Sequence, residues 1–225
     1  MSWLILAVAV VAILFGPQLW VDRVMLRYSA QRSDFPGTGG ELARHLLDRF
    51  DLQTIQVGVT HKGDHYDPIG RTVRLDEAHF AGRSLAAIVI AAHEVGHALQ
   101  DAGGYRPLMW RQRLVGFANA AQRLGNGLIL ATPLIVALTR LPSSGLLLLA
   151  GIASIGSAAL IHLITLPVEW DASFKRALPL LEAGRYIPES DLPAARRILR
   201  AAALTYVAGA LASLLNLWRW LRMGR

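Results

Sequence analysis

The chain has 225 residues, 53% of them hydrophobic, with a mean hydropathy of +0.37 and a net charge of +7. This composition is too apolar for an ordinary soluble domain, and the absence of cysteine excludes a disulfide scaffold while leaving the redox compartment open. No basic cluster is interleaved with aromatic residues, so we expect no nucleic-acid partner. The positive charges lie mostly beside apolar stretches, as in membrane proteins. The sequence therefore predicts a mainly α-helical membrane protein with about four transmembrane helices.

The first apolar stretch runs from Trp3 to Phe15, and no positive charge precedes it. A secretory signal peptide would carry a basic region before the apolar one and a small-residue cleavage site after it. Here three arginines follow the apolar stretch, between residues 23 and 32. This order is typical of a retained anchor whose C-terminal end lies in the cytoplasm. We therefore predict a membrane anchor at residues 1–21.

Residues 34–113 form the main water-exposed segment of the chain. Thr38 and Glu41 have the spacing of a capping box, which predicts a short helix after them. Residues 55–59 alternate in polarity as a strand does, and residues 72–75 have the composition of a second strand, with turn residues between the two. The pair predicts a small β-hairpin or sheet. It is either a purely structural hairpin or an edge that binds an extended substrate by strand addition.

The pattern H-E-x-x-H occurs at residues 93–97, inside a run that predicts a helix from residue 84 to about residue 100. Positions four apart share one face of a helix, so His93 and His97 can bind one metal ion, and the carboxylate of Glu94 can reach a water on that ion. A chance match is the alternative. Ionisable groups in so apolar a helix are costly unless they are paired or bound to metal, which favours the metal site.

The third metal ligand has to be found elsewhere in the chain. A structural zinc site usually includes thiolates, which this chain lacks. The metzincin continuation of the motif fails, because Gln100 and Gly103 stand where it needs Gly and His. The third ligand must therefore be a His, Glu or Asp further along. Glu169 and Asp171 follow an apolar stretch that Pro167 is expected to end, and spacing alone leaves both open.

The remaining chain predicts further membrane helices. One is expected to cross the membrane between residues 114 and 138, the next covers residues 145–166, and the last begins near residue 191 and runs to about residue 221. We expect a single membrane-integrated domain, residues 1–225, in which both large polar segments lie on the same side. Its five parts are the anchor 1–21, the segment 22–113 with the H-E-x-x-H helix, a helical hairpin in the membrane 114–166, the segment with the third ligand 167–192, and a C-terminal membrane helix 193–225.

Several separate runs carry a resemblance to a known family. They are D-H-Y-D-P at 64–68, V-R-L at 73–75, A-A-H-E-V-G-H-A-L-Q at 91–100, G-Y at 104–105, T-L-P-V-E at 165–169, D-A-S at 171–173 and A-A-A-L-T-Y-V-A at 201–208. In these runs the chain resembles the YugP-type neutral zinc metallopeptidases, which are small bacterial membrane proteins. That family is similar in turn to the HtpX-type membrane gluzincins, whose third ligand is a downstream glutamate in an E-x-x-A-D pattern.

The resemblance implies that Glu169 is the third zinc ligand. It also implies a zincin-like α+β portion, which we expect on the cytoplasmic side of the bacterial inner membrane. The expected substrates are peptides or proteins, and the expected surroundings of the chain are a lipid bilayer. The chain departs from the wider pattern at one position, because Ser173 stands where that group has an aspartate. Another residue must therefore orient a ligand histidine, and the sequence does not indicate which.

We interpret the chain as a zinc-dependent endopeptidase of gluzincin type. In this interpretation Zn²⁺ is held by His93, His97 and Glu169 and activates a water, from which Glu94 takes the proton as general base. The alternatives are a non-catalytic zinc-binding membrane adaptor and an intramembrane protease of the site-2 type.

Three residues are open as the group that stabilises the oxyanion. They are Tyr66, His65 and Tyr206, and nothing in the sequence chooses among them. His65 lies in a turn-like run, where a structural role is equally open. The sequence indicates neither the substrate nor the oligomeric state.

Overall fold

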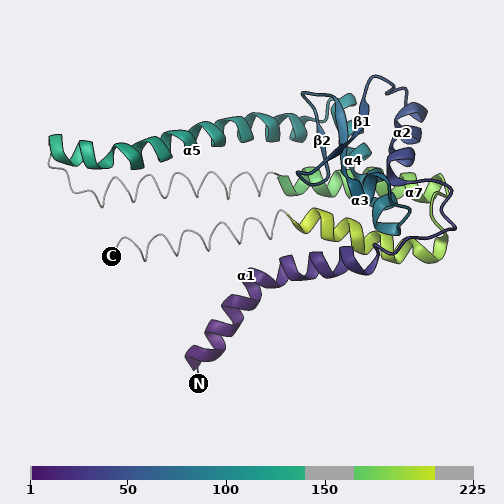
Figure 1. Cartoon of the computed structure of the whole chain (residues 1–225), viewed down its shortest axis with the longest axis horizontal. Helices are drawn as coiled ribbons and strands as arrows, with labels where there is room; N and C mark the ends of the chain where they lie inside the picture. The colour runs from purple at the N-terminus through teal and green to yellow at the C-terminus, as the bar shows by residue number, and fades with distance from the viewer. Residues whose placement is uncertain (1, 140–164, 206–225) are drawn as a thin grey trace. The chain divides into compact units, whose positions relative to one another are not determined.

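The computed structural model describes residues 2–139 and 165–205 (Figure 1). The chain divides into two compact units, of which one comprises Met1–Pro17, Met109–Leu166 and Tyr206–Arg225 and the other Gln18–Leu108 and Pro167–Thr205. Helix α1 (Ser2–Arg27) begins in the first unit and ends in the second, and most of helix α5 (Arg106–Thr139) belongs to the first. The second unit contains every other described element and all the residues discussed below as a site.

Helix α4 (Leu85–Ala102) is the centre of the second unit, because α2, α3, the sheet and a π-helical segment all contact it. These elements are α2 (Gly39–Arg49), α3 (Glu77–Phe80) and the π-helix η1 (Asp171–Ala177), which continues into α7 (Leu178–Ala183). A short 3-10 turn, η2 (Glu189–Asp191), precedes helical residues 192–205. Almost every residue of α4 is buried, which explains why its sequence is apolar on all sides rather than on one.

Local sequence signals account for the starts of α2 and α4. The Thr38 side chain accepts a hydrogen bond from the Glu41 amide, and the Glu41 carboxylate accepts one from the Thr38 amide at 2.7 Å, so the predicted capping box is present. Ser84 caps α4 by accepting from the Ala87 amide. The helix predicted over residues 84–100 is confirmed, with its observed end at Ala102.

The three-stranded sheet has the order β1-β3-β2 and corrects the predicted hairpin. Strands β1 (Gln56–Thr60) and β3 (Thr72–Asp76) pair in parallel, so they are not the two arms of a hairpin. The hairpin joins β3 to a short strand that the sequence analysis missed, β2 (His65–Asp67). Its turn is closed by the Asp67 side chain, which accepts from two turn amides.

The segment after residue 164 is helical from residue 165 through α7, so the expectation that Pro167 ends a helix is wrong. The π-helical hydrogen bonding of η1 lies within this continuous helix, and single π-helical turns are found frequently at functional sites. Helix η1 packs against α4 and thereby brings residues 169–173 to the H-E-x-x-H motif.

The expected membrane spans need the largest correction. Among residues 2–139 and 165–205, no helix is both long enough and apolar enough to cross a membrane. The prediction of about four transmembrane helices is therefore wrong, whereas a mainly helical chain with a small sheet is observed.

Parts of the expected organisation lie outside the described residues. These parts are the turn at 140–144, the apolar stretch up to residue 164 and the last helix beyond residue 205. The expected cytoplasmic side of the site and the expected contact with a lipid bilayer stay predictions.

Gly96 allows the close approach of α4 and η1. A Cβ placed on Gly96 would lie 2.8 Å from the carbonyl oxygen of Ala172, closer than real Cβ atoms come to any backbone atom. The absence of a side chain at this position therefore sets the distance between the helix that carries His93 and His97 and the segment that carries Glu169.

We expect Gly96→Ala to destabilise the fold by about 1–3 kcal/mol, because the added methyl group overpacks a contact between two backbones. Gly116→Ala in α5 is the matched control, since a Cβ there has no heavy atom within 4 Å and alanine favours a helix over glycine by about 0.5–1 kcal/mol. Thermal unfolding of the three proteins measures the difference. A Gly96→Ala protein as stable as the wild type would contradict this account of the contact.

Candidate metal centre

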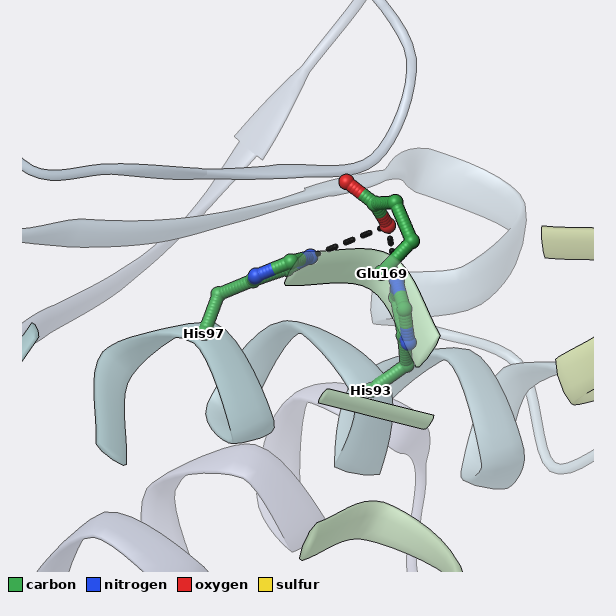
Figure 2. A group of neighbouring side chains, drawn as sticks. All are labelled: His93, His97 and Glu169. Atoms are coloured by element: carbon green, nitrogen blue, oxygen red, sulfur yellow. Dashed lines mark hydrogen bonds and ion pairs between the residues drawn. The ribbon is translucent and has the colours of Figure 1, made fainter. Parts of the chain in front are cut away.

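Three buried side chains converge between α4 and the helical segment that begins at residue 165 (Figure 2). Nε2 of His93 lies 3.1 Å from Oε2 of Glu169, and Nε2 of His97 lies 3.2 Å from the same oxygen. The donor atoms of the three residues all lie within 4.8 Å of one another, and this group could hold a metal ion. Side chains separated by more than seventy residues in the sequence therefore share one polar centre.

Helix α4 positions the two imidazoles. His93 and His97 are four residues apart on the helix, so they leave it from neighbouring points on one face. Their ring centroids are 4.8 Å apart and their planes are inclined at 80°, which directs both Nε2 atoms at a single point instead of stacking the rings. Both residues are at most 5% exposed.

Glu169 supplies the negative charge of the centre and is 1% exposed. Burial alone raises the pKa of this carboxyl, but the charges and hydrogen bonds of His97 and His93 outweigh burial and hold the pKa well below its ordinary value. Glu169 therefore stays ionised at this buried position, and an ionised carboxylate is the form that coordinates a metal.

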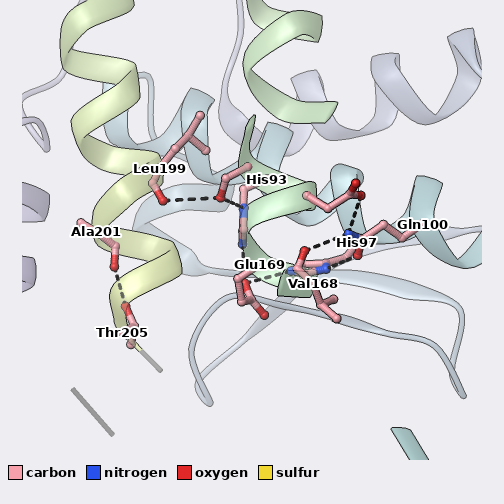
Figure 3. A network of polar contacts seen from close by, with 10 residues as sticks. His93, His97, Gln100, Val168, Glu169, Leu199, Ala201 and Thr205 are labelled. Atoms are coloured by element: carbon pink, nitrogen blue, oxygen red, sulfur yellow. Dashed lines mark hydrogen bonds and ion pairs between the residues drawn. The ribbon is translucent and has the colours of Figure 1, made fainter. Parts of the chain in front are cut away.

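Gln100 fixes the orientation of the His97 ring. The amide nitrogen of Gln100 donates to the Val168 carbonyl oxygen and to Oδ1 of Asp171, both at 2.9 Å. Its amide oxygen therefore faces His97, and it accepts from Nδ1 at 2.9 Å (Figure 3). Gln100 is fully buried, and both its amide oxygen and its amide nitrogen form hydrogen bonds.

Ser173 does the same for His93. Its hydroxyl lies 3.1 Å from Nδ1 of His93 and donates to the carbonyl oxygen of Leu199 at 3.4 Å. Because the hydroxyl proton is directed at Leu199, the Ser173 oxygen accepts from the Nδ1–H of His93. The serine that replaces the aspartate of the wider pattern is thus the residue that orients a histidine, a role for which the sequence analysis named no candidate.

These hydrogen bonds give the donor set its fit to a metal ion. A neutral imidazole has one N–H group, and in both rings the observed partners assign that group to Nδ1. In the absence of a cation, protonated rings pair with the carboxylate; when both rings are neutral, the two Nε2 lone pairs and the Glu169 oxygen can bind one cation among the three atoms. Two imidazole nitrogens and one carboxylate oxygen are also the protein ligands of a known class of catalytic zinc sites.

Asp171, the other carboxylate left open by spacing, points to different partners. Its Oδ1 accepts from Gln100 and from Nε of Arg176, each at 2.9 Å. Burial raises the pKa of Asp171. The hydrogen bonds from Gln100 and Arg176 and the nearby cationic charges lower it by more, so the pKa lies below its ordinary value. Asp171 therefore supports Gln100 and is absent from the group that could hold a metal.

Glu94 is buried on α4, one residue after His93 and 5% exposed. Of the three residues considered for the oxyanion, the Tyr66 hydroxyl donates to Asp101 at 2.8 Å, and burial followed by this hydrogen bond raises the pKa of Tyr66. Nδ1 of His65 lies 2.7 Å from the Gly63 carbonyl oxygen, a contact within the turn. Tyr206 lies outside the described residues.

Comparison with known proteins gives a consistent family. The family model described as "Putative neutral zinc metallopeptidase" matches residues 3–225. A curated relative from Bacillus subtilis (strain 168), named "Putative membrane protease YugP", is 36% identical over 222 residues, which cover 98% of this chain and 95% of the relative. No solved structure matches the chain.

Removal of the Ser173 hydroxyl should loosen the His93 ring without removing a ligand. We expect Ser173→Ala to weaken zinc binding by about 10- to 100-fold, the usual effect of losing a residue that orients a ligand. Ser190→Ala, at an exposed serine of η2, is the control and should bind zinc like the wild type. Competition with a chromophoric chelator measures the affinities. Equal zinc affinity in Ser173→Ala and the wild type would show that the hydroxyl does not orient His93.

Proposed function

The chain belongs to the family of neutral zinc metallopeptidases, and on this premise we propose that it is a zinc-dependent endopeptidase in which Glu94 is the general base. Zn²⁺ is the cofactor that membership of the family implies. The observation that carries the proposal is the convergence of two oriented imidazoles and one ionised carboxylate at a single buried point.

In the proposed site His93, His97 and Glu169 hold the ion. Three protein ligands leave room for water or substrate, as in catalytic and unlike structural zinc sites. When bound, Zn²⁺ supplies Lewis acidity: it lowers the pKa of a coordinated water to about 7 and polarises a carbonyl group.

Glu94 is the proposed acid and base of the reaction. Glu94 is the residue next to the proposed ligand His93 on α4, so its side chain leaves the helix close to the metal site. In the proposed reaction Glu94 takes the proton of the attacking water and later gives it to the amine that leaves when the peptide bond breaks. The same carboxylate serves in both steps, which keeps the proton within the buried site.

Two other functions were considered from the sequence. An intramembrane protease needs the H-E-x-x-H motif within a membrane-crossing helix, and none of the helices described for this chain, α4 included, is long and apolar enough. A non-catalytic zinc-binding adaptor would use the same three ligands but would need no carboxylate at position 94. The two functions that share the zinc site therefore differ in what Glu94 does.

We expect Glu94→Gln to keep stoichiometric zinc and to lower the rate of peptide cleavage by about 10²- to 10⁴-fold, because the base is lost and the ligands remain. Glu182→Gln, which changes an exposed glutamate of α7 in the same way, should leave both properties unchanged. Metal analysis and a cleavage assay on unfolded protein substrates measure them. A wild type that binds zinc but cleaves nothing would favour the adaptor, and full cleavage by Glu94→Gln would contradict the proposed role of Glu94.

A second test separates Glu169 from Asp171 as the third ligand. Glu169→Gln should weaken zinc binding by more than about 100-fold, because a neutral amide oxygen is a much poorer ligand for Zn²⁺ than a carboxylate. Asp171→Asn should weaken it by at most about 10- to 100-fold, since Asp171 acts only through Gln100. Zinc titration of both variants gives the comparison. Loss of zinc from Asp171→Asn with retention in Glu169→Gln would reverse the assignment.

A further inference from the structure

Arg176, on the π-helix η1, begins a chain of side-chain hydrogen bonds that leads to the ligand His97. Its Nε donates to Oδ1 of Asp171 at 2.9 Å, and the same oxygen accepts from the amide nitrogen of Gln100, also at 2.9 Å. The amide oxygen of Gln100 accepts in turn from Nδ1 of His97 at 2.9 Å (Figure 3). Three hydrogen bonds of ordinary length therefore connect a guanidinium that is 27% exposed with a buried imidazole.

Tyr105 joins the two ends of this chain of contacts. Its backbone amide donates at 2.9 Å to the carbonyl oxygen of Gln100, in the last turn of α4. Its ring faces the Arg176 guanidinium, whose Cζ lies 5.7 Å from the ring centroid, within the range of a cation–π contact. Arg176 is thus held by both a carboxylate and an aromatic ring, which together fix the place of its guanidinium.

The direction of the Gln100 amide decides which nitrogen of a neutral His97 ring carries the proton. As observed, the amide oxygen faces Nδ1, so Nδ1 carries the proton and Nε2 keeps the lone pair that a metal ion needs. An amide rotated by half a turn would present its NH2 group to Nδ1. Nδ1 would then have to accept, and the proton would move to Nε2, the atom that faces Glu169.

Two acceptors oppose this rotation, because each of them would then face the amide oxygen. They are the Val168 carbonyl oxygen and Oδ1 of Asp171, both 2.9 Å from the amide nitrogen of Gln100. The Val168 carbonyl is fixed by the backbone, whereas the Asp171 carboxylate can turn about its side-chain bonds. Arg176 bonds to the same carboxylate oxygen and thereby keeps that oxygen in front of the Gln100 amide nitrogen.

We infer that Arg176 is a positioning residue of the metal centre, which acts through Asp171 and Gln100 to keep Nε2 of His97 free for the metal ion. This inference rests on the proposed zinc site, because His97 is one of its three ligands. The alternative is that Arg176 only braces η1 against the end of α4. A brace would change the stability of the fold, whereas a positioning residue also changes the affinity for the metal ion and the geometry of its ligands.

Lys175 offers a matched control for Arg176. It is the adjacent cation on η1, but its Nζ lies 3.9 Å from Oδ2 of Asp171, the oxygen that Gln100 does not use, and its side chain is 72% exposed. An ion pair this exposed contributes little. The same substitution at the two positions therefore separates the loss of a positive charge near Asp171 from the loss of the hydrogen bond that holds its Oδ1.

The test compares zinc affinity in Arg176→Met, Arg176→Lys, Lys175→Met and the wild type by competition with a chromophoric chelator. We expect Arg176→Met to weaken zinc binding by about 10-fold, the lower end of the usual effect of losing a partner of a ligand. Arg176→Lys keeps a cationic donor and should recover part of this loss, and Lys175→Met should bind zinc like the wild type. With Co²⁺ in place of zinc, the absorption spectrum reports the ligand geometry, and it should change in Arg176→Met alone of the two methionine variants.

A double-mutant cycle tests whether Arg176 acts through Asp171. In an Asp171→Ala background the carboxylate is missing, so Arg176→Met should cause no further loss of zinc affinity. An equal loss in both backgrounds would overturn the inference. A lower unfolding temperature of Arg176→Met, with zinc affinity and Co²⁺ spectrum unchanged, would also overturn it and assign Arg176 to the brace. A wild type that binds no zinc would instead reject the proposed site on which the inference rests.

Discussion

Burial of one ionised carboxylate between two oriented imidazoles is the interaction on which the rest of the site depends. An ionised group removed from water is strongly destabilising unless it is paired and hydrogen-bonded. Glu169 meets this requirement through His93 and His97, which both face the same carboxylate oxygen. The residues around this centre therefore serve to hold three polar side chains together between apolar helices.

Two features of the packing make this arrangement possible. Gly96 lets the backbones of α4 and η1 approach closely, and no residue with a side chain fits there without a shift. Ser173 and Gln100 then use the polar atoms of the imidazoles that face away from Glu169. Glu169 and both rings of His93 and His97 thus have partners, which is the condition under which a buried polar network orders a fold instead of weakening it.

Sequence reasoning succeeded where the signal was local. The capping residues of α2 and the apolar run of α4 act over a few positions, and both helices are observed. It failed where the answer depended on tertiary packing. The parallel pairing of β1 and β3 and the short strand β2 depend on long-range contacts that alternation in the sequence does not specify. Hydrophobic stretches were also interpreted as membrane spans, whereas no helix among residues 2–139 and 165–205 is long and apolar enough to cross a membrane.

The site shows the same division. The spacing of His93 and His97 predicted that their imidazoles would share a face, and that follows from helix geometry alone. Choosing Glu169 over Asp171 required a family resemblance, because spacing alone left both carboxylates after Pro167 open. The role of Ser173 was hidden because a hydroxyl can either donate or accept, and the carbonyl that takes its proton here belongs to Leu199, which is distant in sequence.

A crystal structure of the zinc-loaded chain, with anomalous diffraction recorded on both sides of the zinc edge, tests the central claim most directly. The account predicts one zinc ion about 2.0–2.2 Å from Nε2 of His93, Nε2 of His97 and a carboxylate oxygen of Glu169. Zinc bound to Asp171, or to the group formed by Asp64, Asp76 and His79 in place of the H-E-x-x-H histidines, would contradict it.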